Sequence, residues 1–547
     1  MKVAIAQLNY TIGDFEGNAS KIIAEIERSK QAGADLVVFS ELSVTGYYPH
    51  DLLEKKEFIA KAEAAVAQIA GYCQGIAALL GTPRINENER GKKLFNSALF
   101  LADGEIKSAH NKTLLPTYDI FDEYRHFEPN HEFSLVEYKG EKIAVTICED
   151  LWDEQPTANE FGKDKLYAVS PMEELARLKP DFVVNLSASP FSYNQEGWRK
   201  NVLVNKAKSY GIPVLYCNQV GAQTELVFDG GSVYIDAKGE IVKELRYFEE
   251  DFRLIDTQNI GEKELQPKVD YIEKIHDALV LGIRDYFNKM GFKQATLGLS
   301  GGIDSAVTVV LAVRALGAEN VRVLLLPSKY SSDHSVNDAR ELAENLGIRY
   351  DVVNIQSAVD RFEHTLEPLF EGRSPDVTEE NIQARARGIY MMAISNKFGH
   401  ILLNTTNKSE CAVGYGTLYG DMNGGLAVLG DVYKMDVFKL SRFMNKDGEI
   451  IPENTIVKPP SAELRPDQKD TDSLPDYKDL DAMLFNYIEL NKSPKEIADL
   501  GFDEAVVRRV IRMVNMNEYK RFQAAPILRV SSKAFGFGRK MPLVARY

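Results

Sequence analysis

Two short stretches of this chain carry residues that could do chemistry. In the first, Cys148 follows an apolar, strand-like run at Ile143–Ile147, so its thiol would lie on a turn with backbone N–H groups nearby. A thiol attacks a carbonyl carbon as the thiolate, which requires a neighbouring base. No motif containing one of the eight histidines provides that base. Taken alone, Cys148 is better interpreted as a small buried side chain.

The second stretch lies between a strand-like run at 295–299 and a helix-like segment at 306–315. Its glycines allow a tight turn and a close approach to phosphate oxygens, while Ser300, Ser305 and the helix N-terminus supply donors. Asp304 is itself anionic, so its role would be to hold Mg²⁺ that bridges the phosphates. The Walker form GxxxxGK[ST] is absent. We predict a pyrophosphate-binding loop formed by Gly298, Leu299, Ser300, Gly301, Gly302, Ile303, Asp304 and Ser305.

The composition limits what can surround these stretches. The 547 residues predict more than one domain, and 44% hydrophobic with 27% charged residues is ordinary for a globular protein. A net charge of −15 argues against a nucleic-acid partner but not against anionic small molecules. Four scattered cysteines form neither a disulfide framework nor a metal motif. With no leader segment and no membrane-length apolar run, we expect a cytoplasmic protein without a membrane partner.

The elements that must position these residues alternate along the chain. In the first half, a helix-like segment at 18–32 precedes a buried strand at 36–39, and hairpins are expected at 97–109 and 233–243. This pattern suggests a layered α/β sandwich. After a polar stretch at 259–268, strand-like runs at 295–299, 321–326, 350–355 and 400–404 alternate with helices, which predicts a doubly wound parallel sheet. We expect domains at 1–262 and 263–547, and an exposed loop or lid at 452–476.

The surroundings of Cys148 resemble the nitrilase superfamily. Three ordered motifs carry the resemblance: Phe39-Ser40-Glu41-Leu42 followed by Thr45-Gly46-Tyr47, then His110-Asn111-Lys112-Thr113-Leu114-Leu115-Pro116, then Ile147-Cys148-Glu149-Asp150. The resemblance implies an α-β-β-α sandwich. It also implies that Glu41 is the general base, that Cys148 forms a thioester with a carboxamide, and that Lys112 stabilises the oxyanion. Glu123 matches a further carboxylate that supports the site.

The same resemblance implies a glutamine pocket. Tyr118, Phe121, Glu149 and Ser189 match positions that line it. Six residues after Ser189 the family usually carries Lys or Arg to pair with the substrate carboxylate, whereas this chain has Gln195. Gln195 could bind that carboxylate through a neutral hydrogen bond, or Arg199 or Lys200 could supply the charge. The sequence leaves these alternatives open.

The second half resembles the adenine-nucleotide alpha-hydrolases and, among them, the NAD synthetases. Matching segments are 326–332, 380–387, 404–410, 414–421 and 429–434. The resemblance implies that Thr405 contacts ATP and that Glu410 binds metal and substrate. It further implies that Asp421 holds the incoming ammonia and takes its proton. By the same resemblance, Asn381, Arg385, Glu410, Lys434 and Lys520 bind deamido-NAD, and Asp304 and Glu410 hold Mg²⁺.

Together the two halves resemble the bacterial NAD synthetases that use glutamine as nitrogen donor. This resemblance implies glutamine, ATP and deamido-NAD as substrates, and a homo-oligomer. A rival enzyme class, the GMP-synthetase type, shares the loop but uses a Cys–His–Glu glutaminase instead of Glu41, Lys112 and Cys148. A binding protein with an inert first half is the other alternative. The complete sets of residues in both halves argue against that alternative.

Overall fold

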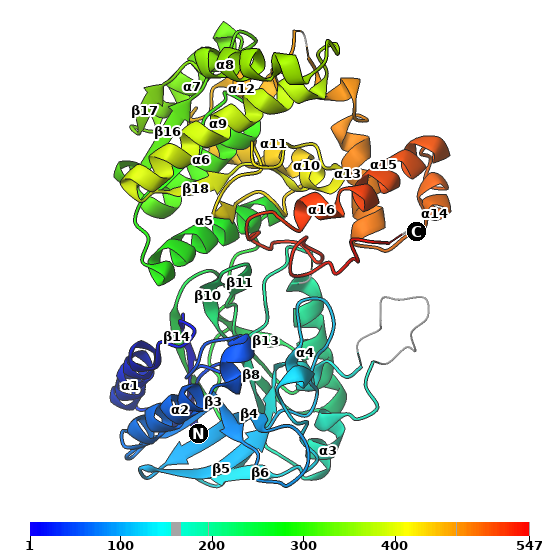
Figure 1. Ribbon diagram of the computed structural model, residues 1–547. Helices are drawn as coiled ribbons and strands as arrows, with labels where there is room; N and C mark the ends of the chain where they lie inside the picture. Colours follow the sequence, from blue (N-terminus) through cyan, green and yellow to red (C-terminus); the bar gives the residue numbers. More distant parts are fainter. Residues whose placement is uncertain (155–165, 195, 467, 546–547) are drawn as a thin grey trace. The chain divides into compact units, whose positions relative to one another are not determined.

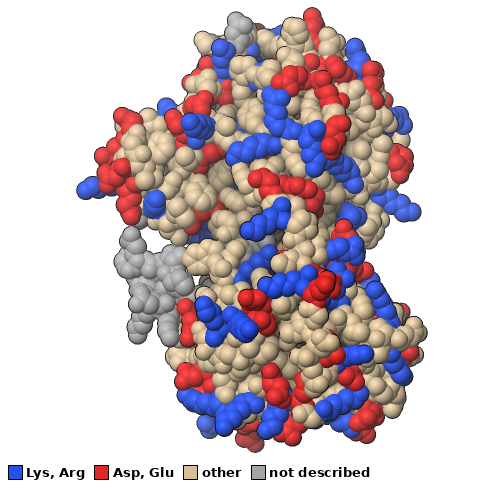
Figure 2. All heavy atoms as spheres, turned by 180° about the vertical axis from the view of Figure 1, so that it is seen from behind, with Lys and Arg blue, Asp and Glu red and all other residues tan. Residues whose placement is uncertain are grey.

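The computed structural model describes residues 1–154, 166–194, 196–466 and 468–545. The chain divides into two compact units, Met1–Lys268 and Val269–Tyr547 (Figure 1). Within the described residues, no helix combines the length and apolar content needed to cross a bilayer. On the face drawn in Figure 2, acidic and basic side chains are interspersed. We therefore expect anionic ligands to be bound there by local groups and not by one broad basic field.

Two six-stranded sheets form the centre of the first unit, in the orders β14-β1-β2-β3-β4-β5 and β13-β12-β9-β8-β7-β6. Each has a parallel middle, β1-β2-β3 or β7-β8-β9, extended by antiparallel strands. The first sheet comprises β1 (Lys2–Gln7), β2 (Leu36–Val38), β3 (Ala77–Ile85), β4 (Leu94–Ala102), β5 (Glu105–Asn111) and β14 (Asp251–Asp256). The second comprises β6 (Leu135–Tyr138), β7 (Glu141–Ile147), β8 (Phe182–Ser187), β9 (Val214–Asn218), β12 (Val233–Ile235) and β13 (Ile241–Glu244).

Each sheet is covered on one face by the other sheet and on its outer face by helices. Because alternate side chains point to opposite sides of a strand, both sets of side chains are buried. In β1, Val3 and Ile5 pack against the facing sheet, whereas Ala4 and Ala6 pack under helices α1 and α2. Helices α3 and α4 cover the outer face of the second sheet. The unit is therefore an α-β-β-α sandwich, as predicted. The helices are α1 (Phe15–Gln31), α2 (Lys56–Ala70), α3 (Pro171–Arg177) and α4 (Glu196–Tyr210), and a separate hairpin pairs β10 (Val220–Gln223) with β11 (Leu226–Asp229).

The predicted elements of this unit form close to their expected positions. The helix expected at 18–32 is α1, and it begins earlier because the Asp14 side chain accepts the N–H of Gly17 and caps it. Both expected hairpins form, as β4–β5 and β12–β13. In the first, Asp103 and Gly104 adopt positive φ angles of 52° and 81°, which a tight hairpin turn requires. The β10–β11 hairpin was not anticipated, because its connection, Thr224-Glu225, contains no glycine to signal a tight turn.

The second unit is built on a five-stranded parallel sheet in the order β17-β16-β15-β18-β19. The chain leaves β15 toward β16 on one side, while β18 lies on the other side, so the strand order reverses beside β15. Ligands of such sheets bind at this point, beyond the carboxyl ends of the strands. This confirms the predicted doubly wound sheet. The strands are β15 (Ala295–Gly298), β16 (Val321–Leu325), β17 (Arg349–Val352), β18 (Ile401–Asn404) and β19 (Leu426–Ala427).

Helices surround this sheet. Leu324 and Leu326, at the end of β16, pack against Val359 of α8 and against Ile382 and Ala386 of α9. Helices α10, α13, α14 and α15 share a further core toward the end of the chain. The bounds are α5 (Tyr271–Met290), α6 (Ile303–Leu316), α7 (Asp333–Asn345), α8 (Gln356–Leu366), α9 (Val377–Phe398), α10 (Lys408–Val413), α11 (Lys434–Met444), α12 (Glu453–Val457), α13 (Tyr477–Ile488), α14 (Pro494–Ala498), α15 (Glu504–Met516) and α16 (Glu518–Arg521). Short 3₁₀ turns are η1 (His50–Glu54), η2 (Glu123–Arg125), η3 (Cys148–Leu151), η4 (Ala318–Asn320), η5 (Glu367–Leu369) and η6 (Asp470–Asp472).

Candidate active sites

The first candidate site lies where strands of the two facing sheets end. Glu41 lies just beyond β2, Lys112 directly follows β5, and Cys148 follows β7 as the first residue of η3. All three are buried, and the thiol of Cys148 interacts electrostatically with both charged side chains. Three segments that are far apart in the sequence therefore bring a thiol, a carboxylate and an ammonium group into one enclosed site.

Lys112 connects the charged groups of this site. Its Nζ donates to Glu41 Oε1 at 2.7 Å and to Glu123 Oε1 at 2.8 Å. The Tyr47 hydroxyl donates to the same Glu123 oxygen at 2.7 Å, and Asn96 Nδ2 donates to Glu41 Oε1 at 2.7 Å. The Lys112 and Glu41 side chains are fully buried and that of Glu123 is 1% exposed. The sequence analysis gave no role to Tyr47, although it lies in a quoted motif, and did not single out Asn96.

Burial and these contacts set the charge states. Burial alone would lower the pKa of Lys112, but Glu123 and Glu41 raise it well above the usual lysine value, so the ammonium keeps its charge. Burial raises the pKa of Glu123 to about 7, even though Lys112 opposes the shift. Burial, and then repulsion from Glu41, raises the pKa of the Cys148 thiol well above its usual range. The resting thiol is therefore neutral and needs a base when it reacts.

A second group of polar side chains meets at Glu149, the neighbour of Cys148. The hydroxyls of Tyr118 and Tyr167 both donate to Glu149 Oε1 at 2.9 Å. Phe121 packs edge-on against Tyr118, with ring centroids 5.6 Å apart. Burial raises the pKa of Glu149, and Lys112 and the two hydroxyls oppose the shift. The sequence analysis named Tyr118, Phe121 and Glu149 for the glutamine pocket. It missed Tyr167, which lies outside every recognised motif.

Ser189 and Gln195 were also predicted to line the glutamine pocket. Ser189 is half-buried, and its N–H donates to Asn218 Oδ1 at 2.9 Å. Asn218 Nδ2 donates back to the Ser189 carbonyl at 3.3 Å, so this turn is held from both sides. Gln195 lies outside the described residues.

The two basic residues considered as partners of the glutamine carboxylate are both engaged inside the unit. Arg199 is buried and makes a two-point ion pair with Asp229, at 2.9 and 2.7 Å. Lys200 pairs with Glu244 at 2.7 Å. Bringing either charge to a substrate carboxylate would break an existing ion pair, and for Arg199 it would leave a buried Asp229 without its partner.

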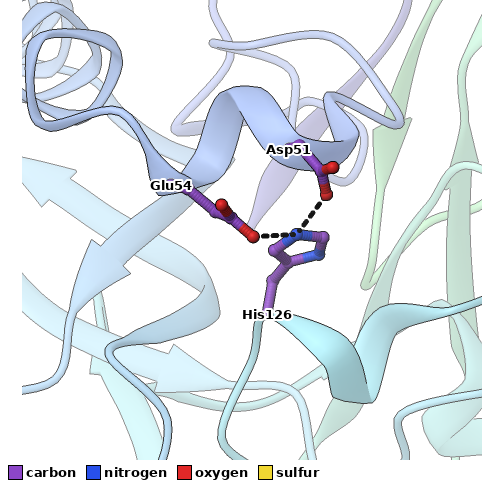
Figure 3. Close-up of side chains that lie close together, drawn as sticks. All are labelled: Asp51, Glu54 and His126. Carbon is purple, nitrogen blue, oxygen red and sulfur yellow. Dashed lines mark hydrogen bonds and ion pairs between the residues drawn. The ribbon is translucent and has the colours of Figure 1, made fainter.

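Beside Glu123, a cluster of Asp51, Glu54 and His126 joins η1 to η2 (Figure 3). His126 Nε2 lies 3.2 Å from Asp51 Oδ1 and 3.9 Å from Glu54 Oε1. Its other ring nitrogen, Nδ1, lies 2.7 Å from the Tyr48 hydroxyl. Both nitrogens of this buried ring are thus occupied. The ring fixes the short turn that begins at Glu123 and so helps to hold that carboxylate in place.

The second candidate site is built on the predicted loop between β15 and α6. Gly301 has a φ of +79°, and a Cβ there would lie 2.2 Å from the backbone oxygen of Ser335, so only glycine fits. Ser300 Oγ and Ser305 Oγ lie 3.1 Å apart, and Ser305 Oγ donates to the Gly302 carbonyl at 2.9 Å. These bonds hold the loop at the start of a 14-residue helix, where backbone N–H groups attract anions.

The loop opens into a cavity of about 300 Å³ at the carboxyl ends of β15, β16 and β18. This is the position where a doubly wound sheet binds its ligand. Of the predicted residues, those that line the cavity are Gly298, Leu299, Ser300, Gly302, Ile303, Asp304, Ser305, Thr405, Glu410, Asp421 and Lys434. Gly301, Asn381, Arg385 and Lys520 are absent from its lining.

Three charged groups lie together in this cavity. Lys434 Nζ donates to Asp304 Oδ2 at 2.5 Å and to Glu410 Oε1 at 3.2 Å, and Asn407 Nδ2 donates to Asp304 Oδ1 at 2.8 Å. Burial raises the pKa of Glu410 to about 8 despite Lys434, and repulsion from Asp304 adds to the shift. Two carboxylates that flank a cation inside a polar cavity offer the hard oxygen ligands that Mg²⁺ prefers. The residues present therefore fit this metal.

Three of the predicted residues outside the cavity lining contact the neighbouring segment 414–421. Asn381 Oδ1 accepts from the Thr417 hydroxyl at 2.7 Å. The exposed Arg385 donates from Nε to the Leu418 carbonyl at 3.2 Å. Lys520 Nζ donates to two backbone carbonyls, of Gly414 and Gly416, at 2.8 Å each. In the same segment Asp421 Oδ1 accepts the N–H of Thr417 at 2.6 Å, and desolvation raises the pKa of its carboxyl group.

Other cavity residues were not assigned a role from the sequence. Arg387, two positions after Arg385, lines the cavity and donates from Nε to the Leu326 carbonyl at 3.0 Å. The loop or lid expected at 452–476 contains α12 and η6, and its residues 458–464 also line the cavity. Within it, Glu463 Oε1 accepts from Ser335 Oγ at 2.6 Å and so fastens this segment to the start of α7.

Comparisons with known proteins match both units of the chain to known families. One family model, described as carbon-nitrogen hydrolase, matches residues 2–262, and another, described as NAD synthase, matches residues 275–524. Glutamine-dependent NAD(+) synthetases from Synechocystis sp. and Thermotoga maritima are 45% and 41% identical to the chain, each covering 100% of it and 99% of the relative. A solved structure of such a synthetase from Acinetobacter baumannii, in complex with ADP, is 39% identical with a TM-score of 0.78, covering 99% of this chain and 98% of that one. The chain therefore belongs to the family of glutamine-dependent NAD synthetases.

Proposed function

We propose that the chain makes NAD in two linked reactions, releasing ammonia from glutamine in residues 1–262 and consuming it in residues 263–547. The observation that carries the proposal is the enclosed group of Glu41, Lys112 and Cys148, in a chain whose second unit has a separate cavity built around Asp304. The pairing has a chemical reason. At neutral pH free ammonia is mostly ammonium, which has no lone pair, so a local source of neutral ammonia is useful.

In the first reaction, Cys148 attacks the side-chain amide carbon of glutamine. Glu41 takes the thiol proton as the C–S bond forms, which gives a tetrahedral oxyanion. Glu41 then returns the proton to the nitrogen, the C–N bond breaks, and ammonia leaves a thioester. Lys112 remains charged throughout and stabilises the oxyanion. Water, deprotonated by Glu41, then hydrolyses the thioester to glutamate. Tyr118, Phe121 and Glu149 form part of the wall that orients the substrate.

In the second reaction, ATP transfers its adenylyl group to the carboxylate of deamido-NAD, and pyrophosphate leaves. The loop from Gly298 to Ser305 binds the phosphates, and Thr405 contacts ATP. Ammonia then attacks the adenylylated carbonyl, AMP leaves, and Asp421 takes the proton. Asp304 and Glu410 would hold Mg²⁺, which neutralises phosphate charge when bound. Asn381, Arg385, Lys434 and Lys520 bind the dinucleotide, and we further propose that the enzyme is a homo-oligomer.

The test uses two variants and two nitrogen donors, with NAD formation measured in the presence of ATP, Mg²⁺ and deamido-NAD. Cys148→Ala should make NAD from a high concentration of ammonium salt but none from glutamine. Asp421→Ala should fail with both donors while still releasing glutamate from glutamine. Glutamine use by Cys148→Ala at a normal rate would exclude the first unit as the ammonia source. Failure of folded Cys148→Ala with ammonium would show that the two reactions cannot be separated as proposed.

A further inference from the structure

One buried carboxylate next to the thiol is unused in the proposed reaction. Asp150 lies in η3, two residues after Cys148, and is 2% exposed. Its Oδ1 accepts the N–H groups of Thr113 and Leu114, both at 2.9 Å, and its Oδ2 accepts the N–H of Ile147 at 2.9 Å. A carboxylate that is buried is stable only when its oxygens are satisfied, and these three N–H groups do so with charge-assisted bonds.

The three N–H groups lie in two separate parts of the site. Thr113 and Leu114 directly follow Lys112, which is the first residue after β5. Ile147 is the last residue of β7 and directly precedes Cys148. β5 belongs to one sheet and β7 to the facing sheet. A single carboxylate therefore ties the backbone beside the ammonium to the backbone beside the thiol, across the interface of the sandwich.

The backbone at Cys148 needs such a tie. Its φ is +42°, a left-handed conformation that non-glycine residues seldom adopt and that costs free energy unless its surroundings impose it. Two fixed neighbours impose it here. Asp150 holds the N–H of the residue before Cys148, and Asn185 Nδ2 donates to the Cys148 carbonyl at 3.3 Å. The turn that presents the thiol thus depends on one contact from Asp150 within η3 and on one from Asn185 in β8.

We propose that Asp150 is a positioning residue that sets the distance between the Lys112 ammonium and the Cys148 thiol during glutamine hydrolysis. This inference rests on the roles proposed above for Lys112 and Cys148. Asp150 touches no reacting atom. It affects the rate because stabilisation of the oxyanion falls steeply when the Lys112 ammonium is displaced from the attacked carbonyl group. The substitution Asp150→Asn preserves the shape of the side chain. However, it places an NH₂ group against an N–H group, so one of the ties is lost.

The first measurement is glutamate release. For Asp150→Asn we expect a loss of about 100-fold in kcat, the size of effect that a misplacement near 1 Å produces. The KM for glutamine should stay within about threefold, and NAD formation from ammonium salt within about twofold, because the second unit is unchanged. Asp181→Asn is the matched control. Asp181 accepts the N–H of Lys142 at 2.7 Å at the opposite end of β7, and its variant should keep wild-type kcat.

The second measurement separates positioning from general support of the fold. Lys112 lowers the pKa of the Cys148 thiol, so the rate of Cys148 alkylation by iodoacetamide near neutral pH reports how close the two groups lie. Asp150→Asn should slow this alkylation about tenfold. In a Lys112→Ala background the same substitution should change it less than twofold. Equal slowing in both backgrounds would mean that Asp150 merely supports the fold and would overturn the proposal.

Further outcomes keep the inference separate from the proposed function. Wild-type kcat in folded Asp150→Asn, with Cys148→Ala inactive on glutamine, would overturn this inference alone. Glutamine hydrolysis by Cys148→Ala would overturn the proposed function instead. If Asp150→Asn does not fold, Asp150→Glu takes its place. Its charge is retained, but the longer side chain forces the two segments apart, so we expect a folded protein with low kcat. Wild-type kcat in that variant would also contradict the proposal.

Discussion

The two candidate sites share one arrangement, a lysine held between two carboxylates. In the first unit Lys112 bridges Glu41 and Glu123, and in the second Lys434 bridges Asp304 and Glu410. The first triad is sealed, with none of its side chains more than 1% exposed. The second lines a cavity, and its two carboxylates are 17% and 15% exposed while the lysine is 2% exposed.

This difference in burial matches the different chemistry proposed for the two sites. Proton transfer at a thiol gains from a dry site, because removal of water strengthens each charge interaction and keeps the base at a fixed distance. Handling a nucleotide with its metal requires groups that an incoming ligand can reach. The ammonium of Lys434 lies between the carboxylates of Asp304 and Glu410. In the proposed function these carboxylates would hold the divalent cation, and the ammonium would then pair with phosphate charge. On this proposal, the arrangement of one lysine between two carboxylates keeps its ion pairs in the first site and exchanges them for ligand contacts in the second.

The largest effect should come from removing the lysine of the sealed triad. Lys112→Met leaves two buried carboxylates without a counter-charge, so we expect a loss of about 3–5 kcal/mol in the free energy of unfolding of the first unit. Glutamate release should fall at least about 1,000-fold. The matched variant Lys434→Met should destabilise the second unit less, since water reaches both of its carboxylates. Chemical denaturation of the two variants measures both effects, and equal destabilisation would contradict the comparison.

The next effect concerns the open triad. Asp304→Asn keeps the hydrogen-bonding shape but removes one anionic oxygen ligand, so NAD formation should fall about 100-fold or more with either nitrogen donor. Glutamate release in the absence of ATP should stay near the wild-type rate. Binding of Mg²⁺–ATP, followed by calorimetry, should weaken in parallel. A variant that adenylylates deamido-NAD at the wild-type rate would show that Asp304 is not a metal ligand.

Sequence analysis identified the site residues that lie just beyond the ends of strands. Glu41 and Cys148 each stand just beyond a buried apolar run, and Gly301 stands in a loop whose close approach to Ser335 only glycine allows. Such positions leave a local signal, because the strand, the turn and the functional residue are neighbours in the chain. The alternation of strands and helices likewise indicated a layered α/β sandwich, whereas the α-β-β-α order of its layers was implied by the resemblance to the nitrilase superfamily.

Contacts that join distant segments left no such signal. Tyr167 reaches Glu149 from outside every motif, and nothing in the spacing of the sequence indicates this contact. Within α9 the sequence pointed to Arg385, whereas the structure turns Arg387 into the cavity. Two residues apart on a helix are about 200° apart around its axis, so the choice depends on which helix face meets the sheet. That face is set by tertiary packing and not by the motif.

A smaller effect concerns pH and tests the sealed triad in another way. Burial raises the pKa of Glu123 to about 7, so its carboxylate form prevails above this pH and is lost as the pH falls below it. Because the protonated form no longer balances the charge of Lys112, glutamate release should decline from about pH 8 to about pH 6. Burial also raises the pKa of Asp150 to about 7, so Glu123→Gln is the control. An unchanged acid limb in this variant would assign the decline to another group.

The smallest effect should come from the substrate-facing wall, where the structure provides a duplicate contact. Tyr118 and Tyr167 both donate to Glu149 Oε1, so Tyr118→Phe removes one hydrogen bond and keeps the ring that packs on Phe121. One hydrogen bond to a charged group contributes about 1.5–3 kcal/mol, but the remaining hydroxyl retains part of this. We therefore expect the KM for glutamine to rise about three- to tenfold with kcat within about twofold. A kcat effect larger than the KM effect would place Tyr118 with the reacting groups instead of the binding wall. Steady-state glutamate release at varied glutamine concentration distinguishes these results. The double variant with Tyr167→Phe should then lose more than the sum of the single losses in free energy, because Glu149 is left buried without either hydroxyl.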